Sequence, residues 1–144
     1  MIVTTLTASL LGLIFLVLSF GVIVQRRRAG LSIGPGTENL GRGEAPDKAP
    51  LLIATRSHAN FAEYVPLSLI LLGLLEYKGF TREVLYGLAA ALVLARILHP
   101  IGMWMMAPNM PRAIGILLQW AMLLVASVLG LYCVLNELML NPAP

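Results

Sequence analysis

Cysteine and histidine are scarce in this chain of 144 residues, which holds one cysteine and two histidines. Because Cys133 stands alone, neither an intramolecular disulfide nor a thiolate metal cluster can form. His58 and His99 have no cysteine or aspartate at ligand spacing beside them, so we predict no metal site. Ser57 is adjacent to His58 in a predicted helix and cannot face that ring as a catalytic serine faces its base.

Charged residues are also few. They make up 12% of the chain, about half the share that is usual in a soluble domain. Hydrophobic residues make up 58% and the mean hydropathy is +0.85, so the chain is predicted to be an integral membrane protein. The net charge of +3 comes from cations in loops and at the ends of apolar runs, where they are typical topology signals, and we expect no nucleic-acid partner.

Apolar runs of the length found here can cross a hydrocarbon core of about 30 Å as helices. The sequence therefore predicts an all-α fold, a single membrane domain over residues 1–144 built as a bundle of four transmembrane helices. The helices are predicted at about 2–25, 51–75, 83–104 and 113–136. Residues 26–50 are rich in glycine, proline and charge, which predicts a long loop that is either a cover for a site or a disordered linker.

Local signals mark the turn between the second and third helices. Gly79 is predicted to terminate the second helix, and Thr81 to begin the third as its N-cap. A connection this short makes the two helices antiparallel neighbours.

The distribution of cations predicts the orientation in the membrane. Arg26-Arg27-Arg28 follows the first apolar run, and the same loop carries two further cations. The loop after the third helix adds Arg112, whereas the opposite side holds only Lys78 and Arg82. Because basic loops remain cytoplasmic, the long loop is predicted to be cytoplasmic, with both termini on the opposite side.

The second apolar run begins with a polar segment. At about 100° per residue, Asn60 lies about 40° from Arg56 and Glu63 about 20° away on the other side, with Tyr64 flanking this stripe. A charge left unpaired in hydrocarbon costs at least ~2.5–3.5 kcal/mol. Two interpretations remain open. Either Arg56 and Glu63 bind the charged ends of a zwitterionic or peptide-like ligand, or they pair with each other and Asn60 bridges them.

A second polar pair lies late in the third apolar run. Arg96 and His99 are three residues apart, on one face of the predicted helix, and we expect His99 at the same membrane level as Arg56. They are candidates for the same binding site. The alternative is that Arg96 extends its side chain to the membrane interface, as arginines near helix ends do.

The polar segment of the second helix resembles a known family signature. The pattern Arg56-x-x-x-Asn60-x-x-Glu63-Tyr64-x-Pro66-Leu67 is similar to that of the MAPEG superfamily, the membrane-associated proteins of eicosanoid and glutathione metabolism, and especially to its small bacterial members. Several fixed polar residues within a membrane span make this pattern specific.

The resemblance extends over essentially the whole chain. Ala95-Arg96-Ile97-Leu98-His99-x-x-Gly102, the four-span layout and the basic cluster after the first span are similar to bacterial members. The resemblance implies a homotrimer in a bacterial inner membrane, surrounded by membrane lipids. It also implies that glutathione, as co-substrate, binds near the cytoplasmic face between adjacent subunits.

The resemblance implies roles for individual residues as well. Positions that bind glutathione in the family are matched by Arg26, Arg56, His58, Asn60, Glu63 and Tyr64. His58 matches a glutamine contact of some relatives, although it points about 160° away from the stripe. Arg96 and His99 are expected in the same site. In related transferases an arginine near the start of the fourth helix stabilises the glutathione thiolate, and Arg112 is the catalytic candidate here.

The function implied by the resemblance is that of a glutathione-dependent transferase or peroxidase. Arg112 would lower the thiol pKa, which is about 8.5 in a free cysteine, and so raise the fraction of thiolate. The thiolate would attack hydrophobic electrophiles or reduce lipid hydroperoxides that arrive from the bilayer. The alternative is a non-catalytic protein of the same fold that binds or presents a lipid. His99 and Met103 stand where mammalian enzymes have tyrosines around the ligand.

Overall fold

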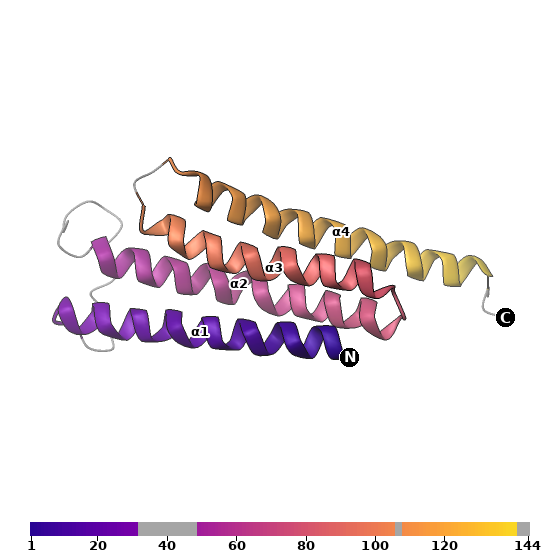
Figure 1. The fold of residues 1–144 in the computed structure, drawn as a ribbon, viewed down its shortest axis with the longest axis horizontal. Helices are drawn as coiled ribbons and strands as arrows, with labels where there is room; N and C mark the ends of the chain where they lie inside the picture. Colours follow the sequence, from indigo (N-terminus) through magenta and orange to yellow (C-terminus); the bar gives the residue numbers. More distant parts are fainter. Residues whose placement is uncertain (32–48, 106–107, 141–144) are drawn as a thin grey trace.

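The computed structural model describes residues 1–31, 49–105 and 108–140 (Figure 1). The chain forms four helices, α1 (Ile2–Arg28), α2 (Ala49–Tyr77), α3 (Arg82–Met103) and α4 (Met110–Leu140). Each is long and apolar enough to cross a membrane, and the described ranges contain no strand. The predicted all-α class with four membrane-spanning helices is therefore confirmed. Most of the predicted long loop, residues 32–48, lies outside the described residues.

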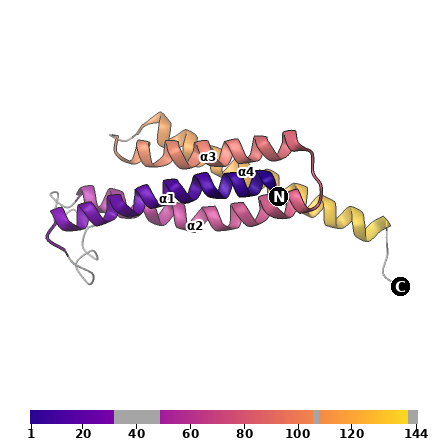
Figure 2. The same cartoon turned by 60° about the horizontal axis from the view of Figure 1, so that its bottom comes forward.

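The helices run side by side (Figures 1 and 2), and in the view of Figure 1 α2 and α3 lie between α1 and α4. Both α1 and α4 pack against this central pair, and among the described residues they do not contact each other. The core where the helices meet includes Leu11, Leu72, Leu92, Met122 and Ala126. The C-terminal turns of α4, yellow in Figure 1, extend past the turn between α2 and α3.

Two glycines end helices by adopting positive φ, which residues with a Cβ atom rarely do. After α1, Gly30 has a φ of +65°, and the N–H of Leu31 donates to the Arg26 carbonyl at 3.0 Å. After α2, Gly79 has a φ of +79°, and Phe80 N–H donates to the carbonyl five residues before it at 3.2 Å. Both ends are Schellman motifs. The predicted helix end at Gly79 is confirmed, and Thr81 is the N-cap of α3 as expected.

The boundaries of α1 and α4 extend beyond the predicted ranges. The basic residues Arg26, Arg27 and Arg28 form the last turn of α1 rather than the start of a loop. Cations at a helix C-terminus interact favourably with its dipole, which supports this longer helix. In the same way α4 begins at Met110, so Arg112 lies in its first turn and not in the preceding connection.

The carboxylate of Glu76 near the end of α2 holds the beginning of α1. Its Oε1 accepts the N–H of Val3 at 3.0 Å, and its Oε2 accepts the N–H of Thr4 at 2.8 Å and the Thr4 hydroxyl at 2.6 Å. The first N–H groups of any helix lack partners within it, and a carboxylate there also interacts favourably with the helix dipole. Glu76 thus caps α1 from a neighbouring helix.

We expect Glu76→Gln to lower the free energy of unfolding by about 1.5 kcal/mol. A glutamine has one acceptor oxygen and one NH₂ group, so the NH₂ group would face the N–H donors at the start of α1 and leave some of them without an acceptor. Thermal unfolding in detergent measures the change. Glu83→Gln is the matched control, since Glu83 is exposed and makes no hydrogen bond or ion pair within the described ranges. Equal stability losses in the two variants would contradict the capping role.

Candidate functional site

A buried arginine joins α3 to the polar segment of α2. Arg96 is only 2% exposed, and its Nη1 donates to Asn60 Oδ1 at 2.9 Å and to the Asn60 backbone carbonyl at 3.4 Å. Its Cζ lies 5.8 Å from the centre of the Tyr64 ring, within cation–π range. The hypothesis that Arg96 extends to the interface is wrong. Arg96 lies seven residues before the end of α3 at Met103, about 10 Å along the helix. Asn60 is therefore closer to the guanidinium than the membrane interface is.

A small cavity of about 150 Å³ opens beside this pair, lined by Asn60, Tyr64, Arg96, Ile116, Gln119 and Trp120. Gln119 Nε2 donates to Ser68 Oγ at 2.8 Å. Two buried atoms of residues that line this cavity, Arg96 Nε and Gln119 Oε1, have no hydrogen-bond partner in the described part of the chain. Buried polar atoms are nearly always paired, so a donor and an acceptor are both left for a polar group placed here.

The two opposite charges of the stripe lie outside the bundle. Arg56 and Glu63 are both exposed, and no ion pair joins them among residues 49–105. The interpretation in which Arg56 and Glu63 pair with each other and Asn60 bridges them is therefore wrong. Asn60 instead accepts hydrogen bonds from Arg96. A cation and an anion consequently stand exposed on a membrane-spanning helix.

His58 lies on the other side of α2, against α1. Its ring stacks on Phe15 with centroids 4.6 Å apart, and its Nε2 lies 3.2 Å from Ser19 Oγ. Arg26, half-buried in the last turn of α1, belongs to the same end of the bundle as the start of α2 (Figure 1). Neither of these two residues lines the cavity at Arg96.

Glycines bring α3 and α4 into close contact near His99 and Arg112. A Cβ atom added at Gly115 would lie 2.8 Å from the His99 backbone nitrogen, and one added at Gly102 would lie against the Arg112 backbone. Neither glycine can carry a side chain unless a helix moves. His99 is buried in this contact, so its ring does not open to the surroundings in a single chain.

The first turn of α4 is held by Asn109. Its Oδ1 accepts the backbone N–H of Arg112 at 3.0 Å, as an N-cap residue does, and its Nδ2 donates to the Gly102 carbonyl at 2.9 Å. The exposed Arg112 lines a hollow of about 520 Å³. Ile116 borders both this hollow and the cavity at Arg96, so the two are adjacent along one face of α4.

A comparison with known protein families matches residues 4–132 to the MAPEG family. The chain belongs to the MAPEG family. The match covers most of the chain and confirms the predicted resemblance. Searches of curated proteins and of solved structures gave no significant match. MAPEG proteins include both glutathione-dependent enzymes and non-catalytic members, so membership alone leaves the activity of this chain open.

Some contributors to the site of this MAPEG chain were not expected from the sequence. Ser68 is one turn beyond Tyr64, which flanks the predicted polar stripe, and Gln119 is a single amide in an apolar run, so the sequence distinguishes both as polar residues within a span. Trp120 is distinguished by its indole N–H, whereas Ile116 is not, because aliphatic residues on a membrane helix give no indication of which ones line a cavity.

Proposed function

We propose that this MAPEG protein is a glutathione-dependent membrane enzyme that transfers the glutathione thiolate to hydrophobic electrophiles or reduces lipid hydroperoxides. One observation carries the proposal. Arg56 and Glu63, of opposite charge and both exposed, stand seven residues apart on α2, about 10 Å along the helix, beside the Asn60–Arg96 pair. Glutathione is a zwitterionic tripeptide. Its carboxylates can bind the Arg56 guanidinium and its ammonium group can bind the Glu63 carboxylate, so its charges complement this surface.

The same exposed charges support assembly into a homotrimer with the site between copies. A charge facing hydrocarbon costs several kcal/mol, so Arg56 and Glu63 need a cover that excludes lipid and supplies polar partners. A neighbouring copy and the bound glutathione together meet this need. Arg26 lies in α1 and His58 packs against α1, so in this assembly both would contact a ligand bound on an adjacent copy rather than one on their own chain.

In the proposed reaction Arg112 stabilises the glutathione thiolate, which forms a carbon–sulfur bond with an electrophilic carbon as the leaving group departs. A guanidinium near sulfur favours the ionised form and lowers the thiol pKa. The hollow at Arg112, about 520 Å³, falls within the range of roughly 300–1,000 Å³ that small-molecule sites occupy. Its opening beside an apolar helix face allows a hydrophobic or lipid substrate to enter from the bilayer.

For orientation we propose a bacterial inner membrane, with the long loop after α1 and the glutathione site at the cytoplasmic face and both termini on the other side. The cations favour this arrangement. Arg26, Arg27, Arg28 and Arg112 gather where α1 and α3 end and where α2 and α4 begin, while Lys78 and Arg82 lie at the opposite end (Figure 1).

We expect Arg56→Ala to weaken glutathione binding by about 10- to 100-fold, the loss of one charge-assisted hydrogen-bonded contact. Isothermal titration of glutathione into the detergent-solubilised protein measures the affinity. Arg82→Ala is the matched control, because Arg82 is an exposed arginine at the opposite end of the bundle. An Arg56→Ala variant that stays folded and binds as tightly as the wild type would exclude Arg56 from the site.

A turnover assay separates the enzyme from a non-catalytic ligand-binding or lipid-presenting protein of the same family. The proposal predicts conjugation of chlorodinitrobenzene with glutathione, or reduction of a lipid hydroperoxide. Glutathione binding with no turnover on either substrate class would reject the enzymatic proposal and leave the binding protein. Absence of both binding and turnover would reject the glutathione site altogether.

A further inference from the structure

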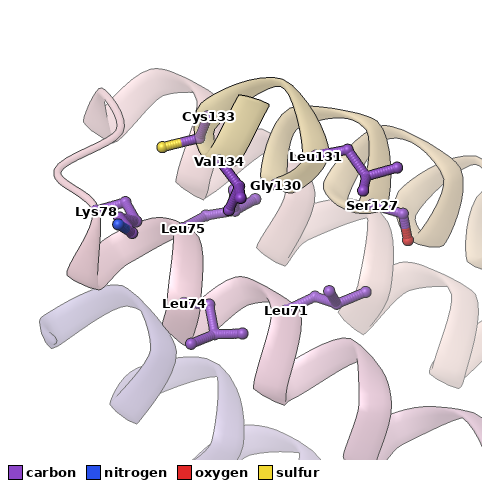
Figure 3. A pocket seen from close by; sticks show the side chains of 9 residues that line it. All are labelled: Leu71, Leu74, Leu75, Lys78, Ser127, Gly130, Leu131, Cys133 and Val134. Carbon is purple, nitrogen blue, oxygen red and sulfur yellow. The ribbon is translucent and has the colours of Figure 1, made fainter. Parts of the chain in front are cut away.

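A separate apolar groove lies between α2 and α4, near the end of the bundle opposite the glutathione site (Figure 3). Its volume is about 520 Å³. The lining residues are Leu71, Leu74, Leu75, Lys78, Ser127, Gly130, Leu131, Cys133 and Val134. None of them belongs to the polar cluster around Arg96 or to the hollow at Arg112.

The groove is formed by matching stripes on the two helices. Residues 71, 74, 75 and 78 of α2 face residues 127, 130, 131 and 134 of α4, each set at the three- and four-residue spacing of one helical face. Leu75 is buried, whereas Leu74 and Leu131 at the edges are 55% and 64% exposed. A Cβ atom added at Gly130 would meet nothing within 4 Å, so the missing side chain leaves the space between the stripes open.

One end of the groove is closed by an ion pair. Lys78 Nζ donates to Glu137 Oε1 at 2.9 Å and to Oε2 at 2.7 Å, which joins the end of α2 to the last turns of α4. The hydrogen bond with Glu137 raises the pKa of Lys78, which therefore stays an ammonium. Its third N–H can still bind an anion, and both side chains remain partly exposed, at 38% and 52%.

The length and the lining of the groove suit a hydrocarbon chain. From Leu71 to Lys78 it extends about 10 Å along α2. The walls offer no charge until Lys78, at the level where the membrane-spanning part of α2 ends.

We propose that this groove holds one acyl chain of a membrane glycerophospholipid, with the lipid phosphate bound to the Lys78 ammonium. The adjacent Glu137 carboxylate complements an amine on the same headgroup, so an ethanolamine phospholipid fits the pair better than an anionic one. The site does not depend on the proposed glutathione chemistry, which lies at the other end of the bundle. Its occupant is retained lipid rather than substrate.

The first test counts the phospholipids retained per chain by native mass spectrometry, after reconstitution in ethanolamine and glycerol phospholipids and transfer to detergent. We expect Gly130→Leu, which fills the groove, to retain one phospholipid fewer per chain than the wild type. Gly87→Leu is the matched control, because Gly87 is an exposed helical glycine of α3 with the same open space around it. Equal retention in Gly130→Leu and Gly87→Leu would overturn the proposal.

The second test examines the headgroup without altering the apolar walls. We expect Lys78→Met to reduce retention of the ethanolamine phospholipid about tenfold, and Glu137→Gln to remove the preference for it over glycerol phospholipid. Retention of free fatty acid in place of phospholipid would overturn the role of the phosphate. Oxidative cross-linking of Cys133, the only cysteine of the chain, between copies in the membrane would instead identify the groove as an interface and reject the lipid.

Discussion

Replacing Arg112 with alanine is expected to reduce turnover of chlorodinitrobenzene with glutathione by about 100- to 1,000-fold, the usual cost of removing one group that stabilises a reactive anion. Glutathione affinity should change little, because the proposed contacts with the ends of the tripeptide come from Arg56 and Glu63. Initial rates measured across a pH series give the apparent pKa of the glutathione thiol in the enzyme. The rising limb of the rate should move up toward a pKa of about 8.5, the value of a free thiol.

Arg112→Ala should leave the fold of α4 unchanged. The first turn of α4 is held by Asn109, which accepts the backbone N–H of Arg112 and donates to the Gly102 carbonyl. Both bonds are kept in the variant, so the helix should begin at the same residue. Arg82→Ala, which removes an exposed arginine at the opposite end, serves as the control for net charge. An Arg112→Ala enzyme with an unchanged rate and pH profile would exclude Arg112 as the group that ionises the thiol.

The helices of this protein could be predicted from the sequence because their determinants are local. An apolar run either is or is not long enough to cross the hydrocarbon core, and Gly79 provides the positive φ that ends α2. The boundaries were less accurate where local chemistry extends a helix. Asn109 caps α4 before Arg112, and Gly30 ends α1 only after the three arginines.

The partners inside the site could not be predicted in this way. Helical spacing gives the angles among Arg56, Asn60 and Glu63, but the partner of Asn60 depends on how α2 and α3 are rotated against each other. Arg96 is 36 residues away in the chain, and its position alone is equally consistent with an interfacial arginine. The groove between α2 and α4 could not be predicted for the same reason. A leucine in a membrane helix indicates burial or lipid contact, but it does not distinguish the lining of a groove from a packed core.

Asn60→Leu is expected to lower the free energy of unfolding by about 3 kcal/mol. It removes the side-chain acceptor of the Arg96 guanidinium, which is buried and has no carboxylate partner in the described ranges. Thermal unfolding in detergent measures the loss. Ala62→Leu, at an exposed position of the same helix, controls for the added volume. A stability loss no greater than that control would mean that Arg96 does not depend on Asn60.

The double variant Asn60→Leu with Arg96→Met separates structure from ligand binding. Replacing a buried polar pair by apolar side chains of similar size is often close to neutral, so the double variant should recover most of the lost stability. Glutathione affinity should be low in the single and in the double variant, because both lack the Asn60 amide and the double variant also lacks the Arg96 Nε beside the cavity. Wild-type glutathione affinity in a stable double variant would show that the pair serves the fold alone and that the ligand contacts lie entirely with Arg56, Glu63 and their neighbours.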